Sequence, residues 1–162
     1  MSKATRLPTP LSRRKAESHK GDYGHVLVVA GSLRCSGAAL LCAESCLRSG
    51  AGLVTLAVPP EIIPSVLKNK IKEVMVIPLR EAGKDLRRYD ALAVGPGLGT
   101  RPATQQLVLR LLKSCGCPMV IDADGLNCLA GRLQALKARG EKGLKTVLTP
   151  HAGEMARLLG SP

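Results

Sequence analysis

Short apolar runs alternate with helical patterns along the chain after Gly24, and this alternation restricts the possible folds more than any other feature. Six runs rich in β-branched residues have the length of buried strands, at 25–30, 53–58, 73–78, 91–94, 118–121 and 145–148. Helical patterns separate them, at 37–49, 60–68, 103–113, 125–138 (in one or two pieces) and 154–159. Strands that alternate with helices form parallel βαβ units. The sequence therefore predicts an α/β fold of three αβα layers with a mostly parallel central sheet.

Capping residues near three of the helical patterns support these boundaries. Ser36 is expected to cap the helix from 37, and Thr100 or Pro102 is expected to begin the helix that ends near 113. Asp124 stands where an N-cap carboxylate would accept hydrogen bonds from the first free amides of the next helix.

Length and composition indicate one folded domain. The 162 residues are 45% hydrophobic and 22% charged, a balance that excludes extensive disorder. Charged residues interrupt the apolar runs well before the ~20 residues of a membrane-spanning helix, and no secretory signal precedes them. We expect a basic N-terminal tail at 1–20, followed by the domain at 21–162.

The positive charge favours small anionic ligands over nucleic acid. Lys and Arg number 24 against 12 acidic residues, which gives a formal net charge of +12. A protein that binds single strands needs aromatic stacking platforms, and this chain has two tyrosines and no Phe or Trp. The basic residues are also spread along the chain instead of forming one motif. The sequence therefore predicts a nucleotide-like ligand, no nucleic acid and no membrane partner.

The six cysteines indicate reduced thiols in a cytoplasmic protein. They form no CxxC pair, no histidine stands at zinc-ligand spacing, and a chain of this length does not need a disulfide framework. Cys115 and Cys117 are close enough in sequence to bind a soft metal. A structural zinc site requires four ligands, however, and nothing accompanies these two.

Glycine-rich or polar turns follow four of the six predicted strands. They lie at 31–39, 95–99, 122–127 and 149–154. In an open parallel sheet, ligands bind beyond the carboxyl ends of the strands. Because the four turns share that edge, the sequence predicts one binding cleft there.

Most of these turns also have a purely structural explanation. The glycines at 95, 97 and 99 allow a ligand to approach the backbone, or they form a tight turn. Asp122 and Asp124 suit Mg²⁺ or a substrate hydroxyl, whereas Asp124 can also be a helix cap. His151 can hold a phosphate or a ribose, or it can be an ordinary turn residue.

Five segments together resemble a known family. They are Ser18-His-Lys-Gly-Asp-Tyr-Gly-His25, Leu47-Arg-Ser-Gly-Ala-Gly-Leu-Val-Thr55, Val94-Gly-Pro-Gly-Leu-Gly99, Val120-Ile-Asp-Ala-Asp-Gly-Leu-Asn127 and Leu148-Thr-Pro-His-Ala-Gly-Glu-Met-Ala-Arg-Leu158. In this order they are similar to signatures of the ADP- or ATP-dependent NAD(P)H-hydrate dehydratases, the YjeF C-terminal domain family. One such segment alone would be weak evidence. Five in order, over almost all of 18–160, are specific.

The resemblance implies a ribokinase-like fold and a repair reaction. In this family, ADP or ATP with Mg²⁺ phosphorylates the hydroxyl of a hydrated nicotinamide coenzyme, and loss of phosphate regenerates NADH or NADPH. The resemblance further implies a homo-oligomer and cooperation with an NAD(P)H-hydrate epimerase. His151 and the absence of a preceding epimerase domain favour ADP and a stand-alone dehydratase.

The resemblance also assigns residues to the cleft. For the hydrated substrate it implies backbone contacts near the start of the first long helix and in the glycine-rich turn, a histidine contact, and three polar side chains that line the site: Ala38, Ala39, Gly97, His151, Asp122, Asp124 and Asn127. For the nucleotide it implies Gly95, Gly99 and Glu154, and Glu154 would hold Mg²⁺ through water.

One family element is missing from these 162 residues. The family carries a Gly-x-Gly-Asp turn whose amides form an anion hole and whose aspartate is the base, and no such turn occurs here. We therefore expect an incomplete ribokinase-like domain, the front part of a longer product, with no catalytic residue of its own and no turnover alone. The alternatives are a ribokinase-like kinase of vitamin precursors and a non-catalytic nucleotide-binding module.

Overall fold

The computed structural model describes residues 15–160, in which six parallel strands form one sheet. The strand order is β3-β2-β1-β4-β5-β6. The strands are β1 (His25–Val29), β2 (Leu53–Val58), β3 (Met75–Pro78), β4 (Ala91–Val94), β5 (Met119–Ile121) and β6 (Thr146–Leu148). All six predicted strands are confirmed, and every neighbouring pair is parallel.

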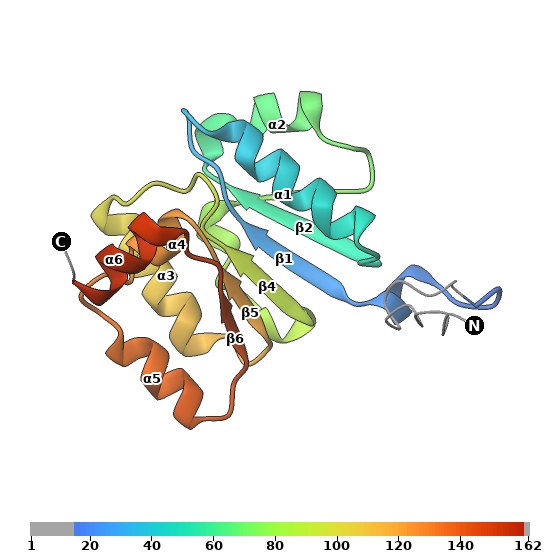
Figure 1. The fold of residues 1–162 in the computed structure, drawn as a ribbon. Helices are drawn as coiled ribbons and strands as arrows, with labels where there is room; N and C mark the ends of the chain where they lie inside the picture. Colours follow the sequence, from blue (N-terminus) through green and yellow to red (C-terminus); the bar gives the residue numbers. More distant parts are fainter. Residues whose placement is uncertain (1–14, 161–162) are drawn as a thin grey trace, which may run out of the picture.

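Helices cover both faces of the sheet (Figure 1). The α-helices are α1 (Ser36–Arg48), α2 (Ile63–Asn69), α3 (Pro102–Ser114), α4 (Asp124–Asn127), α5 (Gln134–Glu141) and α6 (Ala152–Leu159). Short 3₁₀ turns are η2 (Lys20–Tyr23), η3 (Pro60–Ile62), η4 (Leu79–Glu81) and η5 (Leu86–Arg88). One apolar core lies between the sheet and α1 with α2, and a second lies between the sheet and α3 with α5. The predicted three-layer αβα fold is therefore confirmed.

The helix boundaries differ from the expected caps at two positions. Ser36 is the first residue of α1 instead of its cap, and Asp124 is the first residue of α4 instead of its cap. Pro102 begins α3, as predicted, because its missing N–H leaves no hydrogen bond unmade there. The pattern at 125–138 corresponds to α4 and the first part of α5, and Gly131, with φ of 71°, lies in the turn between them.

Part of one sheet face is uncovered. Val120 on β5 pairs in register with Val147 on β6. These two side chains are 40% and 55% exposed, whereas Met119 and Ile121, on the other face of β5, are buried. The burial of β5 therefore comes from the α3 side alone.

Three further predictions concern the cysteine thiols, the N-terminal tail and membrane-spanning helices. None of the six cysteines forms a disulfide in the structure. Most of the predicted basic tail, residues 1–14, lies outside the described residues. Among residues 15–160, no helix is long and apolar enough to cross a bilayer.

Candidate functional site

The strand order places a crevice at the carboxyl edge of the sheet. The chain runs outward from β1 to β3 and then returns to β4 on the other side of β1, so the loops that follow β1 and β4 diverge. The two loops are joined at their base, where the Gly31 amide donates to the Pro96 carbonyl at 2.8 Å. Ligands of open α/β sheets bind at such a switch point.

The glycine-rich turn after β4 packs tightly against its neighbours. At Gly95, with φ of 128°, a Cβ would lie 1.9 Å from the Asp122 carbonyl oxygen. At Gly97, with φ of 64°, a Cβ would lie 2.7 Å from the Cβ of Cys35 and 3.0 Å from that of Ala38. Glycine is therefore required at both positions for conformation and for space. The turn brings Gly97 and Ala38 together, as predicted.

The amides of this turn have different partners. The Gly95 amide donates to the Val29 carbonyl at 3.0 Å, and the Gly99 amide donates to Asp124 Oδ2 at 2.8 Å. Within the described part of the chain, no hydrogen bond engages the Gly97 amide. Gly97 therefore offers the one uncommitted glycine amide of the turn to a ligand.

Ala39 lies apart from the other predicted contacts. It is fully buried, and its Cβ lies 2.8 Å from the point that a Cβ would occupy at Gly31. Its side chain packs against Gly31 in the loop after β1 and does not reach the crevice. Ala38, half-buried beside Gly97, is therefore the better candidate for a ligand contact at the start of α1.

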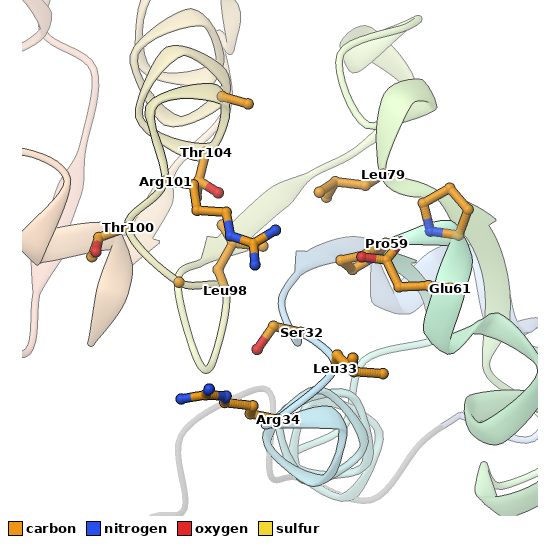
Figure 2. Close-up of a pocket in the computed structure, with 13 residues that line it drawn as sticks. Ser32, Leu33, Arg34, Pro59, Glu61, Leu79, Leu98, Thr100, Arg101 and Thr104 are labelled. Atoms are coloured by element: carbon orange, nitrogen blue, oxygen red, sulfur yellow. The ribbon is translucent and has the colours of Figure 1, made fainter.

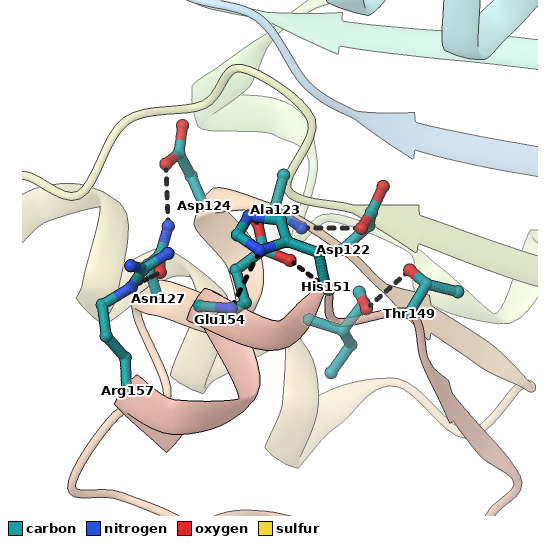
Figure 3. Close-up of polar contacts among 10 residues, drawn as sticks. Asp122, Ala123, Asp124, Asn127, Thr149, His151, Glu154 and Arg157 are labelled. Carbon is teal, nitrogen blue, oxygen red and sulfur yellow. Dashed lines mark hydrogen bonds and ion pairs between the residues drawn. The ribbon is translucent and has the colours of Figure 1, made fainter. Parts of the chain in front are cut away.

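Polar side chains link the turn after β4 to α6 (Figure 3). Asp124 accepts from the Gly99 amide through Oδ2, and its Oδ1 accepts from Asn127 Nδ2 at 3.3 Å. Asn127 Oδ1 in turn accepts from Arg157 Nε at 2.8 Å. Asp124 and Asn127 thus lie together, as predicted. Asp124 holds the glycine-rich turn in place instead of capping a helix.

Ala123 separates the two aspartates in a strained backbone conformation. Its φ of 49° and ψ of −121° belong to a region that favours glycine. The Ala123 amide donates to Asp122 Oδ1 at 2.9 Å, and its carbonyl accepts from the Asn127 amide at 3.1 Å. These hydrogen bonds maintain the strained backbone conformation of Ala123. They also direct the Asp122 and Asp124 side chains apart.

Replacement of Ala123 by glycine should stabilise the chain. Relief of a strained φ is worth ~1–3 kcal/mol, and the added freedom of the unfolded glycine offsets ~0.5–1 kcal/mol of it. We expect the free energy of unfolding of Ala123→Gly to rise by about 1 kcal/mol in urea titrations. Ala138→Gly, in the exposed middle of α5, should lower it by about 1 kcal/mol. Equal losses in the two variants would show that Ala123 is unstrained.

His151 and Glu154 form a capping box at the start of α6. His151 Nδ1 accepts from the Gly153 amide at 3.1 Å, and Glu154 Oε2 accepts from the His151 amide at 3.1 Å. His151 Nε2 therefore carries the ring proton and lies 3.2 Å from Glu154 Oε1. The Glu154 side chain is 8% exposed and that of His151 is 68% exposed. The imidazole is thus held in one orientation with a face open to a ligand.

An open cleft continues outward from Gly99. Its volume is about 860 Å³. Thirteen residues line it: Ser32, Leu33, Arg34, Pro59, Pro60, Glu61, Leu79, Leu98, Gly99, Thr100, Arg101, Ala103 and Thr104 (Figure 2). Gly99 is the one predicted site residue among them. Ser32, Leu33, Arg34 and Leu98 fall within the predicted turns at 31–39 and 95–99 without having been assigned a role, and the other lining residues carry no recognisable motif. Their position in the chain was the one available indication of a role, since residues 32–34 follow β1 and residues 98–104 follow β4.

Among the described residues no metal cluster lies at the site, and the thiols of Cys42 and Cys128 have raised pKa values. Within residues 15–160, no three His, Cys, Asp or Glu side chains lie close enough to hold a metal ion. Burial raises the pKa of the Cys128 thiol, whose Sγ lies 3.8 Å from the Gly99 carbonyl oxygen, to about 11. The hydrogen bond that the Cys42 thiol donates to Cys46, followed by burial, raises the pKa of Cys42 far above its usual value. Both thiols stay protonated at neutral pH and are poor nucleophiles.

The sequence and the fold match one family. A family model described as NAD(P)H-hydrate dehydratase matches residues 26–162. The bifunctional NAD(P)H-hydrate repair enzyme of Moorella thermoacetica is 46% identical over 164 residues, which cover 93% of this chain and 30% of the relative. This match favours the dehydratases over the vitamin-precursor kinases.

Solved structures agree with this result. A ribokinase-like superfamily protein from Enterococcus faecalis superposes with a TM-score of 0.77 at 27% identity, over 93% of this chain and 53% of its own. The ADP/ATP-dependent NAD(P)H-hydrate dehydratase from Bacillus subtilis, co-crystallised with ATP and Mg²⁺, superposes with a TM-score of 0.74 at 34% identity, over 94% and 53%. The chain thus spans about half the length of these solved relatives. Its fold is ribokinase-like, and the chain belongs to the NAD(P)H-hydrate dehydratase family.

Proposed function

We propose that this chain supplies the substrate-binding half of an NAD(P)H-hydrate dehydratase. The observation that carries the proposal is the Gly97 amide, which is uncommitted and lies against Ala38 at the switch point of the sheet. A hydrated nicotinamide has a ring hydroxyl and a carboxamide, and both can accept a hydrogen bond from such an amide. His151, whose ring nitrogens are engaged by Glu154 and the Gly153 amide, would provide a second contact through its exposed ring face.

The chemistry of the reaction is consistent with a chain that binds the substrate while another segment supplies the base. Hydroxide is a poor leaving group and phosphate is a good one, so phosphorylation of the ring hydroxyl by ADP or ATP lets the oxygen leave as phosphate and regenerates the dihydronicotinamide ring. The residues of this chain would hold and orient the hydrate, with Asp122, Asp124 and Asn127 beside it. The base and the anion hole of the family belong to a Gly-x-Gly-Asp turn, which these 162 residues lack. We therefore expect binding without turnover.

A nucleotide with Mg²⁺ fits the site on chemical grounds. Mg²⁺ keeps several waters and is held by one or two carboxylates together with substrate phosphates, so it does not need a cluster of protein ligands. Glu154 would hold it through water, and the capping box fixes that carboxylate at the carboxyl edge of the sheet. Gly95 and Gly99 would shape the turn near the nucleotide, since their own amides are already donated.

We further propose the cellular setting that fits this function. A coenzyme-repair enzyme with free thiols fits the cytoplasm, where NADH and NADPH are abundant and thiols stay reduced. An NAD(P)H-hydrate epimerase would convert the unreactive epimer of the hydrate into the reactive one. A homo-oligomer is expected from the family. Size-exclusion chromatography with light scattering would measure the oligomeric state.

Calorimetric titration of the chain with NADPH hydrate tests the function directly. We expect binding, with no recovery of NADPH absorbance when ADP or ATP and Mg²⁺ are added. His151→Ala should raise the dissociation constant of the hydrate about tenfold, because the contact of the ligand with the exposed imidazole ring is lost.

A matched variant separates a ligand contact from helix capping. His151→Asn keeps a side-chain acceptor for the Gly153 amide, so it should retain the melting temperature, whereas the alanine variant loses about 1 kcal/mol of stability. Both variants should bind the hydrate more weakly. An unchanged dissociation constant in both would remove His151 from the site. Binding of a vitamin precursor in place of the hydrate would overturn the proposed function.

A further inference from the structure

We propose that Arg34 and Arg101 bind the phosphate groups of the dinucleotide hydrate in the cleft beyond Gly99. This inference rests on the proposed function and extends it, because the dinucleotide is much longer than its nicotinamide. The cleft of about 860 Å³ begins at Leu98 and Gly99, next to the turn assigned to the hydrated ring. It is large enough to hold a substantial part of a dinucleotide.

The two arginines approach the cleft from different elements. Arg34 precedes α1, and Arg101 is the residue before the first turn of α3. Figure 2 shows the Arg101 guanidinium reaching toward the centre of the cleft, with Arg34 at its rim beside α1. A diphosphate between the loops after β1 and β4 would thus meet one guanidinium from each side. Arginine forks bind phosphate oxygens bidentately.

Both guanidiniums are available to a ligand. Among residues 15–160, a basic or imidazole side chain contacts a carboxylate at three places, His19 with Asp22, Arg48 with Glu44 and His151 with Glu154, and none involves Arg34 or Arg101. Glu61 is the single acidic residue that lines the cleft, against two arginines. The side chains that line the cleft therefore carry a net positive charge. Within the described structure, neither arginine forms an ion pair.

The remaining lining suits a nucleotide as well. Hydroxyls of Ser32, Thr100 and Thr104 can donate to phosphate or ribose oxygens, and Leu33, Leu79 and Leu98 give an apolar wall for a ring. Neither α1 nor α3 has an acidic residue in its first turn. The positive ends of both helices are thus not neutralised where they meet the cleft. The hydrated nicotinamide itself is uncharged, so these positive groups fit the phosphates of the ligand.

Charge-removing variants of this chain test the assignment. Arg34→Gln and Arg101→Gln should each raise the dissociation constant of NADPH hydrate about tenfold, and the double variant should raise it further. Arg101→Lys should recover part of the loss, because the charge stays while the fork is lost. Binding by wild type should weaken as salt rises from about 50 mM to about 500 mM, and binding by the double variant should weaken much less.

Arg87→Gln is the matched control. Arg87 is exposed in η5, just before β4 and hence at the opposite end of the sheet from the cleft, and its replacement removes the same charge. Its dissociation constant should stay within about twofold of wild type, since only the long-range field changes. All variants should keep the wild-type melting temperature, because the replaced side chains are exposed.

Parallel titrations with NADPH hydrate, NADH hydrate and ADP identify the phosphate that is bound. A loss for both hydrates, or for NADPH hydrate alone, supports the proposal through the diphosphate or the ribose phosphate respectively. A loss for ADP alone would assign the arginines to the nucleotide and overturn it, as would no loss for any ligand. If wild type binds neither hydrate, the proposed function itself fails. If wild type binds and the arginine variants bind equally well, this inference alone fails.

Discussion

Replacement of Gly95 by alanine should unfold the chain or lower its melting temperature by about 10 °C or more. At Gly95 the φ of 128° is one that alanine rarely adopts, and the new Cβ would lie 1.9 Å from the Asp122 carbonyl and 2.6 Å from the Gly125 amide nitrogen. Both neighbours are backbone atoms, so no side chain can move aside. Strain and overlap together should lower the free energy of unfolding by about 4 kcal/mol or more, as thermal and urea unfolding would measure.

Two other glycines provide controls of graded severity. Gly99 has φ of 78°, but a Cβ there would have no neighbouring atom within 4 Å, so Gly99→Ala should cost about 1–2 kcal/mol from conformation alone. Gly116 has neither a positive φ nor a neighbour within 4 Å, so Gly116→Ala should be neutral or slightly stabilising. A Gly95→Ala chain as stable as Gly99→Ala would show that the turns after β4 and β5 separate easily. The close packing described for the site would then be wrong.

The strands and the shared edge of the turns were predictable from the sequence because they depend on local patterns. Buried parallel strands produce continuous β-branched runs, and the turns after them must lie at the carboxyl edge. The proximity of Gly97 to Ala38 follows from that edge, whereas that of Asp124 to Asn127 follows from their spacing of three residues in α4. The strand order across the sheet is not encoded locally, so the position of the cleft between β1 and β4 emerged from the structure alone.

The roles of individual polar residues were less predictable, because each depends on a partner distant in sequence. Aspartate is a residue type that often caps helices. The Asp124 carboxylate nevertheless accepts a hydrogen bond from the Gly99 amide, 25 residues away. Ala123 gives no sign in the sequence of its positive φ, since glycine is the residue that such a conformation favours. Arg101 lines the cleft because the path of the chain before α3 places it there. Side-chain type alone gave none of these three results.

Arg139 is the strongest example of a residue whose role depends on partners distant in sequence. It lies in a basic stretch, which predicts a solvent-exposed side chain, yet it is 2% exposed. Its guanidinium donates to the carbonyls of Leu112, Cys115 and Cys117, and its Nε donates to Thr146 Oγ1 at 2.8 Å. No carboxylate forms an ion pair with it among residues 15–160. The carbonyls at the end of α3, together with the negative end of the helix dipole, replace a counter-ion.

Arg139→Ala should therefore lower the free energy of unfolding by about 3–5 kcal/mol. The change leaves three carbonyls near the end of α3 without their donor, creates a cavity, and separates α5 from β6 at Thr146. Arg139→Lys should recover part of the loss, because an ammonium can donate to some of the carbonyls but cannot span them as a planar fork does. Lys137→Ala, at an exposed position of the same helix, should stay within about 0.5 kcal/mol of wild type. Urea unfolding would compare the three variants. An alanine variant within about 1 kcal/mol of wild type would mean that water satisfies these carbonyls, and that α5 is held to the sheet by its apolar contacts alone.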